Sequence, residues 1–367
     1  MKIQPVRGTH DIYGKDLLNY KFIKDTISEL AQIYDYKEII TPIFENSELF
    51  KKPLGENSDV VLKEMYSFKD RNESFLTLRP EYTTPMIRAA LSNNLLDKLP
   101  VKLFGFGPMF RRERPQKGRF RQFNQINFEI FGVDDQFSDV EIIALAENFL
   151  NKIIPKNSYK LYLNSLGDKN TLQKFKNELT NYFDKYKKNL SEESKDKIQS
   201  NPLRILDSKI EKNKDLINSA PKINQFYSKV ASKKFEEVQE LLVNSNIQFE
   251  IDPNLVRGLD YYCNSVFEFK SESLGSQSTI IGGGRYDGLI KMLGGPNIAG
   301  CGWASGVERL MMLSKKIQKK MPFLHVIILD DKYKNYGFNL INILRNNNIN
   351  TTFNYKYDLK KSLSNAN

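Results

Sequence analysis

The side chains with the clearest chemical potential lie in the segment FRRERPQKGRFRQFNQINFEIFG, residues 110–132. The period-two alternation of a strand puts apolar residues on one face of its second half and polar residues on the other. The polar face carries Phe123, Gln125, Asn127 and Glu129. An antiparallel strand with one solvated face has the same pattern, so the strand alone does not establish a binding site.

A dense cluster of cations precedes this strand and favours a binding site. Guanidinium groups bind phosphate oxygens through paired hydrogen bonds, so a loop this rich in arginine suits a ligand that carries phosphate. The cluster consists of Arg111, Arg112, Arg114, Lys117, Arg119 and Arg121. The loop and the strand together predict a site for a phosphate-bearing ligand, and a solvated basic surface is the alternative.

The segment LRPEYTTPMIR, residues 78–88, places a carboxylate and a hydroxyl two positions apart. In an extended chain Glu81 and Thr83 point the same way and can hold an ammonium group. The alternative is a helix N-terminus, with Thr83 or Thr84 as the capping residue and Pro85 in the first turn. The two interpretations are compatible.

The segment LVRGLDYYCNSVFEF, residues 255–269, contains an isolated arginine beside a glycine. Burial of a guanidinium is costly unless an anion accompanies it, so Arg257 is a candidate for contact with a ligand. An ion pair with Asp260 is the structural alternative. Farther along, GGGRYDGLI and SGVERL supply glycines for close backbone approach and place Arg309 at the start of a helix.

The predicted elements around these segments form a sheet with flanking helices. Residues 16–34 and 139–154 have the apolar spacing of amphipathic helices. Strand-like segments fall at 37–44, 59–68, 74–79, 101–110, 119–131, 159–167, 247–252 and 262–270. Their order predicts an antiparallel sheet.

Two stretches depart from this pattern. From about 168 to 248 the sequence is rich in Lys, Asn and Glu with helical periodicity, which predicts a helical insertion. After Pro322, FLHVIILDD predicts a short buried strand and YGFNLINILRNNN a helix, the opening of an α/β unit. Only 45 residues follow Pro322, so this last unit is expected to be unfinished.

Composition limits the possible partners and cofactors. The 367 residues carry 55 Lys and Arg against 44 Asp and Glu, a net charge of +11 that favours polyanionic partners. Cys263 and Cys301 have no metal-ligand spacing, and His10 and His325 lie at opposite ends of the chain, so neither zinc nor histidine-based catalysis is expected. No signal peptide or membrane span is recognisable, which predicts a cytoplasmic protein.

In this order the segments resemble the motifs of class II aminoacyl-tRNA synthetases, and most closely those of the bacterial histidyl-tRNA synthetase family. TPIFENSELFKKPLG, which contains Pro42, is similar to motif 1, the arginine-rich segment to motif 2, and GCGWASGVERL to motif 3. RPEYT and LVRGLDYY are the family-specific blocks, and NPLRILDSK at 201–209 resembles the bacterial insertion domain. The resemblance covers about residues 3–355.

The resemblance implies an α+β fold, a class II synthetase core of antiparallel sheet flanked by helices, with a helical insertion and a partial C-terminal α/β domain. The implied boundaries are 1–167 for the first part of the catalytic core, 168–248 for the insertion, 249–318 for the second part of the core, and 322–367 for an incomplete anticodon-binding domain. We expect this last domain to have been cut from a longer chain or to fold poorly at its end.

The implied activity is ATP-dependent ligation of L-histidine to tRNA(His) through a histidyl-adenylate, by a homodimer formed through motif 1. Mg²⁺ would accompany ATP, with no metal bound by the protein itself, no zinc and no organic cofactor. The implied catalytic residues are Arg257 and Arg111. The implied histidine-binding residues are Glu81, Thr83, Arg111, Gln125, Glu129, Arg257, Tyr261 and Tyr262. The implied ATP-binding residues are Arg111, Arg119, Phe123 and Arg309.

More specific roles also follow from the resemblance. Glu129 and Tyr262 would hold the imidazole, and Phe123 and Arg309 would sandwich adenine. The loop from Gln116 to Arg119 would meet the acceptor end of the tRNA, and the Lys-rich insertion would clamp its stem. Two non-catalytic relatives are alternatives: the regulatory subunit of ATP phosphoribosyltransferase, and a sensor domain that binds uncharged tRNA. Retention of all four arginines of the implied sites favours the enzyme.

Overall fold

The computed structural model describes residues 3–55, 60–116, 118–208, 213–315, 323–353 and 359–366. The chain divides into two compact units, Met1–Lys315 and Lys316–Asn367, and each is described by itself. Three residues that enter the sequence predictions, Lys117, Lys209 and Pro322, lie outside the described residues. Within the described residues no helix is both long and apolar enough to cross a membrane.

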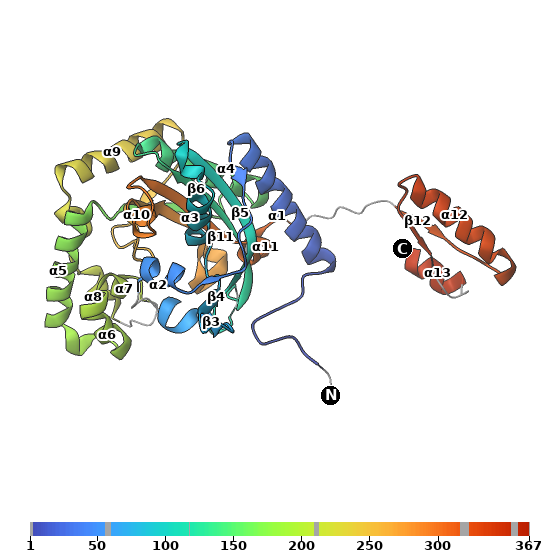
Figure 1. The fold of residues 1–367 in the computed structure, drawn as a ribbon, viewed down its shortest axis with the longest axis horizontal. Coiled ribbons are helices and arrows are strands. Elements are labelled where there is room, and N and C mark those ends of the chain that lie inside the picture. Colours follow the sequence, from blue (N-terminus) through green and yellow to red (C-terminus); the bar gives the residue numbers. More distant parts are fainter. Residues whose placement is uncertain are drawn as a thin grey trace. The chain divides into compact units, whose positions relative to one another are not determined.

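An eight-stranded sheet with the strand order β1-β5-β6-β11-β10-β9-β7-β8 forms the centre of the first unit (Figure 1). The outermost pairs, β1 with β5 and β7 with β8, are parallel, and the inner pairs are antiparallel. The strands are β1 (Lys37–Glu38), β5 (Val101–Phe110), β6 (Gln122–Phe131), β7 (Lys160–Ser165), β8 (Glu250–Ile251), β9 (Cys263–Lys270), β10 (Thr279–Arg285) and β11 (Gly300–Gly306). This sheet and its flanking helices confirm the predicted α+β class.

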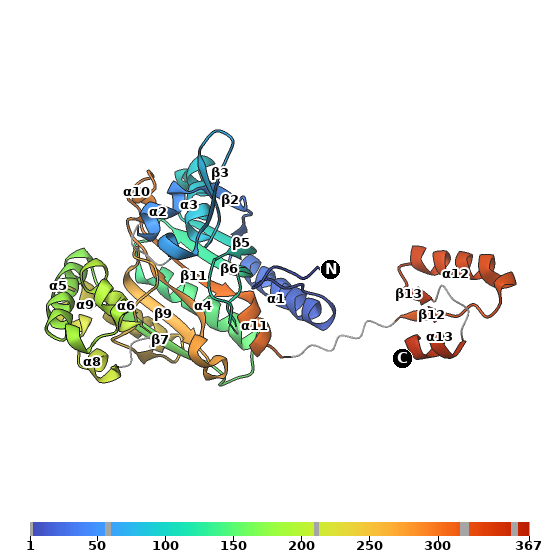
Figure 2. The ribbon, with the colours of Figure 1, turned by 90° about the horizontal axis from the view of Figure 1, so that it is seen from below.

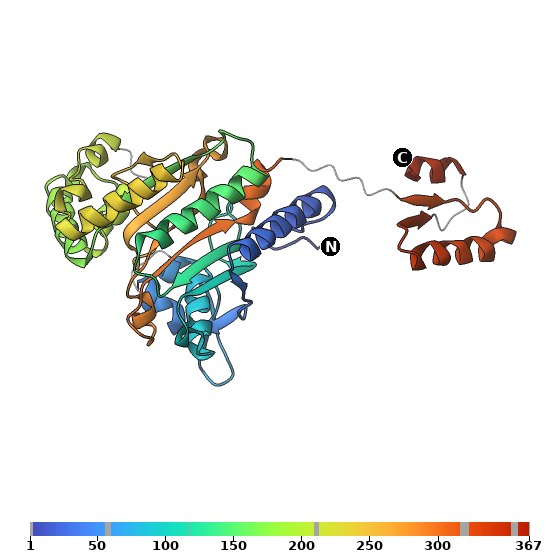
Figure 3. The same ribbon diagram turned by 90° about the horizontal axis from the view of Figure 1, so that it is seen from above.

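Helices cover one face of the large sheet, and Figure 3 shows three of them, α1, α4 and α9, lying across it. The buried residues Ile23, Ile27 and Leu30 of α1 recur every three or four positions, so they line one side of that helix. The Asp135 carboxylate accepts the Phe137 N–H at 2.8 Å and caps the start of α4. The helices are α1 (Gly14–Ile33), α4 (Gln136–Ile153), α9 (Lys229–Asn244) and α11 (Val307–Leu313).

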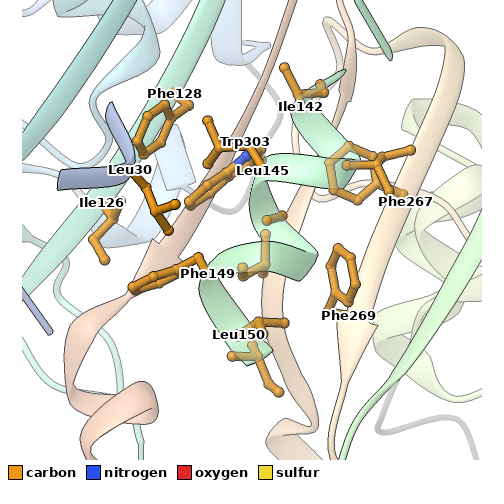
Figure 4. Close-up of a cluster of buried hydrophobic side chains, with 14 of the residues drawn as sticks. Leu30, Ile126, Phe128, Ile142, Leu145, Phe149, Leu150, Phe267, Phe269 and Trp303 are labelled. Carbon is orange, nitrogen blue, oxygen red and sulfur yellow. The ribbon is translucent and has the colours of Figure 1, made fainter. Parts of the chain in front are cut away.

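Aromatic residues fill the space between these helices and the sheet (Figure 4). Phe128 of β6 stacks on Trp303 of β11 with ring centroids 4.8 Å apart. Phe149 of α4 and Phe267 and Phe269 of β9 belong to the same cluster, and each is almost fully buried. Burial on this scale makes the helix-covered face a large source of stability in the first unit.

The opposite face of the sheet carries smaller elements. They are the helices α2 (Glu48–Leu54), α3 (Thr83–Ser92) and α10 (Leu289–Met292), and a second sheet of β2 (Phe44–Asn46), β4 (Phe75–Leu78) and β3 (Tyr66–Lys69) in the order β2-β4-β3.

Several strand predictions were partly wrong. The strand predicted at 37–44 is interrupted, since β1 and β2 belong to different sheets, and the strand predicted at 247–252 is reduced to β8. Residues 60–64 form a π-helical turn instead of a strand, and the Glu64 carbonyl accepts the Arg112 N–H at 2.7 Å. This turn is therefore set by a contact distant in sequence, which local propensity does not report. The strand predicted at 119–131 begins at Gln122, because Gln116 and Arg119 pair with each other in a loop hairpin.

The helices that follow β7 gather into a lobe at one end of the first unit (Figure 2). They are α5 (Lys169–Lys185), α6 (Glu192–Ser200), α7 (Leu203–Leu206) and α8 (Lys214–Asn218), with 3-10 turns at 187–189 and 223–226. Phe175, Leu179 and Phe183 of α5 are buried at helical spacing. These residues share an apolar cluster with Leu255 and Val256, so the lobe packs on the segment that precedes Arg257.

The described residues of the second unit form a small parallel sheet and two helices. In it β12 (Leu324–Val326) pairs with β13 (Thr351–Phe353), and α12 (Lys334–Asn346) connects the two strands after a 3-10 turn at 331–333. The helix α13 (Leu359–Ala366) follows. The strand and helix predicted after Pro322 are both present in this unit, but the strand was predicted to be buried and is not: Leu324 is 49% exposed.

Candidate active site

Glycines leave unusual space on the cavity side of the central strands, beneath α3. A Cβ added at Gly302 of β11 would overlap the Glu129 carboxylate, and one added at Gly282 of β10 would overlap the Arg257 guanidinium. Gly300 of β11 similarly makes room for the Tyr286 ring. The glycine-rich segments therefore matter because they admit large polar side chains from neighbouring elements, and not only because they form turns.

A cavity of about 980 Å³ opens on this face. Its wall contains most of the predicted site residues, drawn from segments far apart in the sequence: Glu81, Thr83, Arg111, Arg119, Phe123, Gln125, Arg257, Tyr261, Tyr262 and Arg309. Glu129 is not part of the wall. The structure thus brings Arg111 and Arg257 to one cavity, with Glu129 one hydrogen bond behind it.

The Glu81 carboxylate caps the N-terminus of α3. Its oxygens accept the backbone N–H groups of Thr83 and Thr84, each at 2.8 Å, and also the Thr84 hydroxyl. The prediction that Thr83 or Thr84 caps this helix was wrong, because the carboxylate reaches the same donors from outside the first turn. Burial raises the pKa of Glu81, while these hydrogen bonds and the nearby Arg111 charge oppose the rise.

The Glu129 carboxylate lies under Thr83 and is only 1% exposed. It accepts the Thr83 hydroxyl at 2.6 Å, the Asn127 amide at 3.2 Å and the Tyr286 hydroxyl. Burial raises its pKa to about 8, although the hydrogen bonds from Thr83, Tyr286 and Asn127 work in the other direction.

Two buried oxygens beside Glu129 lack a hydrogen-bond partner within the described parts of the chain. They are the Gln125 Oε1 and the Asn127 Oδ1, and both residues line the cavity. A buried acceptor without a partner is costly, so a ligand that presents N–H or ammonium groups here would relieve that cost. The polar face of β6 is therefore suited to a ligand rich in donors.

Arg257 is paired with Glu268, not with Asp260 as the structural alternative suggested. Its guanidinium carbon also lies 5.5 Å from the centroid of the Tyr262 ring. Burial works against the charged form, but Glu268 outweighs it and the pKa of Arg257 is raised. The carboxylate of Asp260 instead accepts the Asn201 amide at 2.7 Å. Arg257 is therefore a charged group at the cavity wall throughout the physiological pH range.

Arg111 enters the cavity from the loop before β6. Its Nε donates to the Pro80 carbonyl at 2.8 Å, and its guanidinium carbon lies 5.4 Å from the Phe123 ring centroid. Arg119, in the same loop, forms an ion pair with Glu113 at 3.0 Å. The carbonyl of Pro80 and the ring of Phe123 therefore fix the direction in which Arg111 presents its charge.

Arg309 holds the loop and a strand end together. Its Nε donates to the Gly118 carbonyl at 3.0 Å and its Nη1 to the Thr279 carbonyl at 2.8 Å. Burial, followed by the charge of Arg119, lowers its pKa. Arg309 and Phe123 line the same cavity, but the cation that contacts the Phe123 ring is Arg111.

Several site residues were missed at the sequence level. Asn127 was recognised only as part of a polar strand face, and Tyr286 and Glu268 were not considered, although they bind Glu129 and Arg257. The signal for Tyr286 was its position two residues after the glycine run of GGGRYDGLI. The insertion also contributes Arg204 to the cavity wall. Within the described residues, no group of three His, Cys, Asp or Glu side chains is placed to hold a metal ion.

Comparison with known proteins gives consistent matches. A family model described as histidyl-tRNA synthetase matches residues 8–310. The histidine–tRNA ligase of Wolbachia pipientis wMel is 42% identical over 367 residues, which cover 100% of this chain and 90% of that protein. The crystal structure of the apo histidyl-tRNA synthetase of S. aureus has a TM-score of 0.80 at 30% identity, covering 100% of this chain and 88% of that one.

A further structure shares the fold at lower identity. It is described as an ATP phosphoribosyltransferase regulatory subunit/histidyl-tRNA synthetase from Bacillus halodurans, with a TM-score of 0.71 at 20% identity, covering 99% of this chain and 96% of that one. At this identity the likeness shows the fold alone.

The antiparallel sheet, the glycine-lined face and the arginine-rich loop that leads into β6 have the architecture of a class II aminoacyl-tRNA synthetase. The alignment over the whole chain is more specific than this architecture, because it includes the two blocks RPEYT and LVRGLDYY within the matched range. The chain belongs to the histidyl-tRNA synthetase family.

Proposed function

We propose that the chain joins L-histidine to tRNA(His) in two steps. The histidine carboxylate attacks the α-phosphorus of ATP and releases pyrophosphate. The terminal ribose hydroxyl of the tRNA then attacks the carbonyl carbon of the histidyl-adenylate and releases AMP. Both steps are transfers in which positioning and charge stabilisation dominate. Use of ATP follows from membership of the synthetase class.

One observation carries the proposal: Arg111 and Arg257 line a cavity together with Thr83 and Asn127, and Glu129 lies directly behind these two residues and binds both. Two cations suit the carboxylate of the amino acid and the phosphate that it attacks. The unpartnered oxygens of Gln125 and Asn127 suit donors of the amino acid. These features support the binding of an amino acid and a nucleotide side by side.

For histidine, we propose that Glu81, Thr83 and Gln125 hold the amino and carboxylate ends, and that Glu129 and Tyr262 select the imidazole, with Tyr261 against the same ligand. Glu129 lies behind Thr83 and Asn127, which both donate hydrogen bonds to it. One of these hydrogen bonds must break before the imidazole ring can bind Glu129. A pocket with buried polar groups discriminates against analogues that leave those groups unpaired, by about 10⁴–10⁵ in favourable cases.

For ATP, we propose that Arg111 contacts the α-phosphate and Arg119 the terminal phosphates. Phe123 and Arg309 would enclose the adenine, and Arg257 would neutralise charge that develops on the phosphorus during attack. Mg²⁺ belongs to the proposal as the companion of the triphosphate. Glu113 and Glu308 are cavity carboxylates of the oxygen-donor type that Mg²⁺ prefers.

For the quaternary structure, we propose a homodimer through the motif 1 region. Apolar side chains there are exposed in the isolated chain: Ile40 is 78%, Ile43 44% and Phe44 54% exposed. Exposed apolar side chains that lie this close together in the sequence support an interface in this region. We place tRNA charging in the cytoplasm. The domain boundaries at 167, 248 and 318 are likewise part of the proposal.

Histidine-dependent exchange of pyrophosphate into ATP tests the function directly. The synthetase should catalyse exchange with histidine and not with other amino acids, and should then charge tRNA(His). A regulatory subunit or a tRNA sensor would bind a ligand without exchange. Absence of exchange from a folded dimer with bound histidine would contradict the proposal.

A further inference from the structure

The insertion places a short segment, residues 201–206, directly on the loop that carries Arg257. The Asn201 amide donates to the Asp260 carboxylate at 2.7 Å. The Nη1 of Arg204 lies 3.1 Å from the position that a Cβ would take on Gly258. The guanidinium of Arg204 is therefore packed closely against the backbone of Gly258, next to Arg257.

Apolar packing fixes this segment on the other side. Leu203, Ile205 and Leu206 of α7 are buried in one cluster with Leu255 and Val256, the two residues before Arg257. The Arg204 N–H donates to the Asn201 carbonyl at 3.1 Å, so the two polar residues form one turn. Hydrogen bonds and apolar contacts together determine where Arg204 lies relative to Arg257.

This arrangement gives the insertion a place in the wall of the synthetase cavity. Arg204 lines the same cavity as Arg111 and Arg257, and Lys197 from α6 lines it as well. The insertion also contributes the carboxylates of Glu193 and Asp207 to this wall, and Glu193 forms an ion pair with Lys197 at 2.6 Å. Arg204 is the guanidinium that the insertion brings to the cavity. A guanidinium in such a position suits a phosphate oxygen, since it offers paired donors in a fixed plane.

We propose that Arg204 is a phosphate-binding residue of the active site, contributed by the insertion, and that Asn201 positions it through Asp260. The inference rests on the proposed function and deepens it, because it makes the insertion part of the adenylation or transfer site. The phosphate belongs either to the triphosphate of ATP or to the 3′ end of the tRNA. In both cases the ligand chemistry is the same.

Two substitutions separate charge from packing. Arg204→Gln removes the charge, whereas Arg204→Lys keeps it. Lys152→Gln, on an exposed part of α4 away from the cavity, controls for the loss of one positive charge. ATP affinity is measured by calorimetry and tRNA affinity by filter binding, and histidine-dependent exchange and tRNA charging are measured in parallel. The binding assays need no catalysis, so a wild type that fails to exchange overturns the proposed function without deciding the role of Arg204.

If the phosphate is that of ATP, Arg204→Gln should weaken ATP binding about tenfold or more, with the KM for ATP in exchange raised and the KM for histidine unchanged. If it is that of the tRNA, exchange should stay normal while tRNA affinity falls by a similar factor. Arg204→Lys should recover part of either loss, and Asn201→Ala should cause a smaller loss of the same kind.

Unchanged affinity for both ligands in Arg204→Gln would overturn the inference. Equal losses of kcat in the Gln and Lys variants, with both affinities at the wild-type value, would also overturn it, because they indicate a packing role only. Should Arg204→Gln not fold by circular dichroism, the Lys and Asn201→Ala variants decide the question by the same measurements.

Discussion

The two faces of the central sheet are made from the same strands but differ in what they bury. On β6, Ile126 and Phe128 pack under helices, while Gln125, Asn127 and Glu129 face the cavity side. Burial of an apolar side chain contributes roughly 1.5–3 kcal/mol to stability. Burial of a carboxylate costs free energy that its hydrogen bonds only partly offset.

The helix-covered face of the sheet thus contributes mainly to stability, and the cavity face carries the polar groups of the candidate site. The helix-covered face can hold the strands in register while the cavity face keeps Glu129 in an environment that disfavours its charge and holds Arg257 beside Glu268. Substitutions on the two faces should therefore separate unfolding free energy from catalytic rate.

The largest expected effect is on the helix-covered face. Phe149→Ala removes a fully buried ring from α4 and should lower the free energy of unfolding by about 3–5 kcal/mol. Urea denaturation followed by circular dichroism measures this change. The KM for histidine should stay at the wild-type value in the folded fraction. If the KM for histidine also changed strongly in the folded protein, the two faces would not be independent.

On the cavity face, Arg257→Ala should slow histidine-dependent exchange by about 10²–10³-fold, because it removes one charge that stabilises the transition state. Glu268 keeps Lys270 at 3.3 Å and the Thr279 hydroxyl at 3.1 Å as partners, so stability should change little. Lys160→Ala, which breaks an exposed ion pair with Glu250, is the control and should exchange normally. Near-normal exchange by Arg257→Ala would show that Arg257 does not stabilise the transition state.

Gly282→Ala tests the cavity face in a second way, because it removes no charged group and only changes where Arg257 lies. The new methyl group would occupy the position of the Arg257 guanidinium and displace it, for a loss of about 10²-fold in exchange. The double variant Gly282→Ala, Arg257→Ala should be no slower than Arg257→Ala alone, since both changes act on one group. Additive losses would contradict this account.

The last prediction, with the smallest effect per pH unit, is a pH dependence of stability. The pKa of Glu129 is about 8 in the folded chain, above its ordinary value, so the folded state binds more protons than the unfolded state between these values. This group therefore lowers the free energy of unfolding as pH rises from about 5 to 8, by at most about 1.4 kcal/mol per pH unit. Glu129→Gln should flatten that fall in thermal unfolding measured across the range. An unchanged slope would mean that Glu129 is ionised throughout.

The sequence was sufficient where the pattern is local. The alternation over residues 122–131 predicted both faces of β6 correctly, and the helices α1 and α4 followed from apolar spacing. Local pattern was also enough to identify the arginine-rich loop.

Contacts between distant segments could not be predicted in this way. Nothing near Arg257 in the sequence indicates that it pairs with Glu268 and not with Asp260, because the choice depends on the strand register between β9 and β10. The Tyr286 contact with Glu129 joins residues 157 positions apart. The turn at 60–64 was misjudged for the same reason.

The order of strands in the large sheet also bears on how the protein is made. β6 needs β11 along its second edge, and β7 needs β9, yet the whole insertion is translated between these partners. A nascent chain on the ribosome must therefore keep the edges of β6 and β7 from pairing wrongly until residue 306 has emerged. Pairings across such sequence distances form slowly, so the insertion lobe can fold while the site it borders is still incomplete.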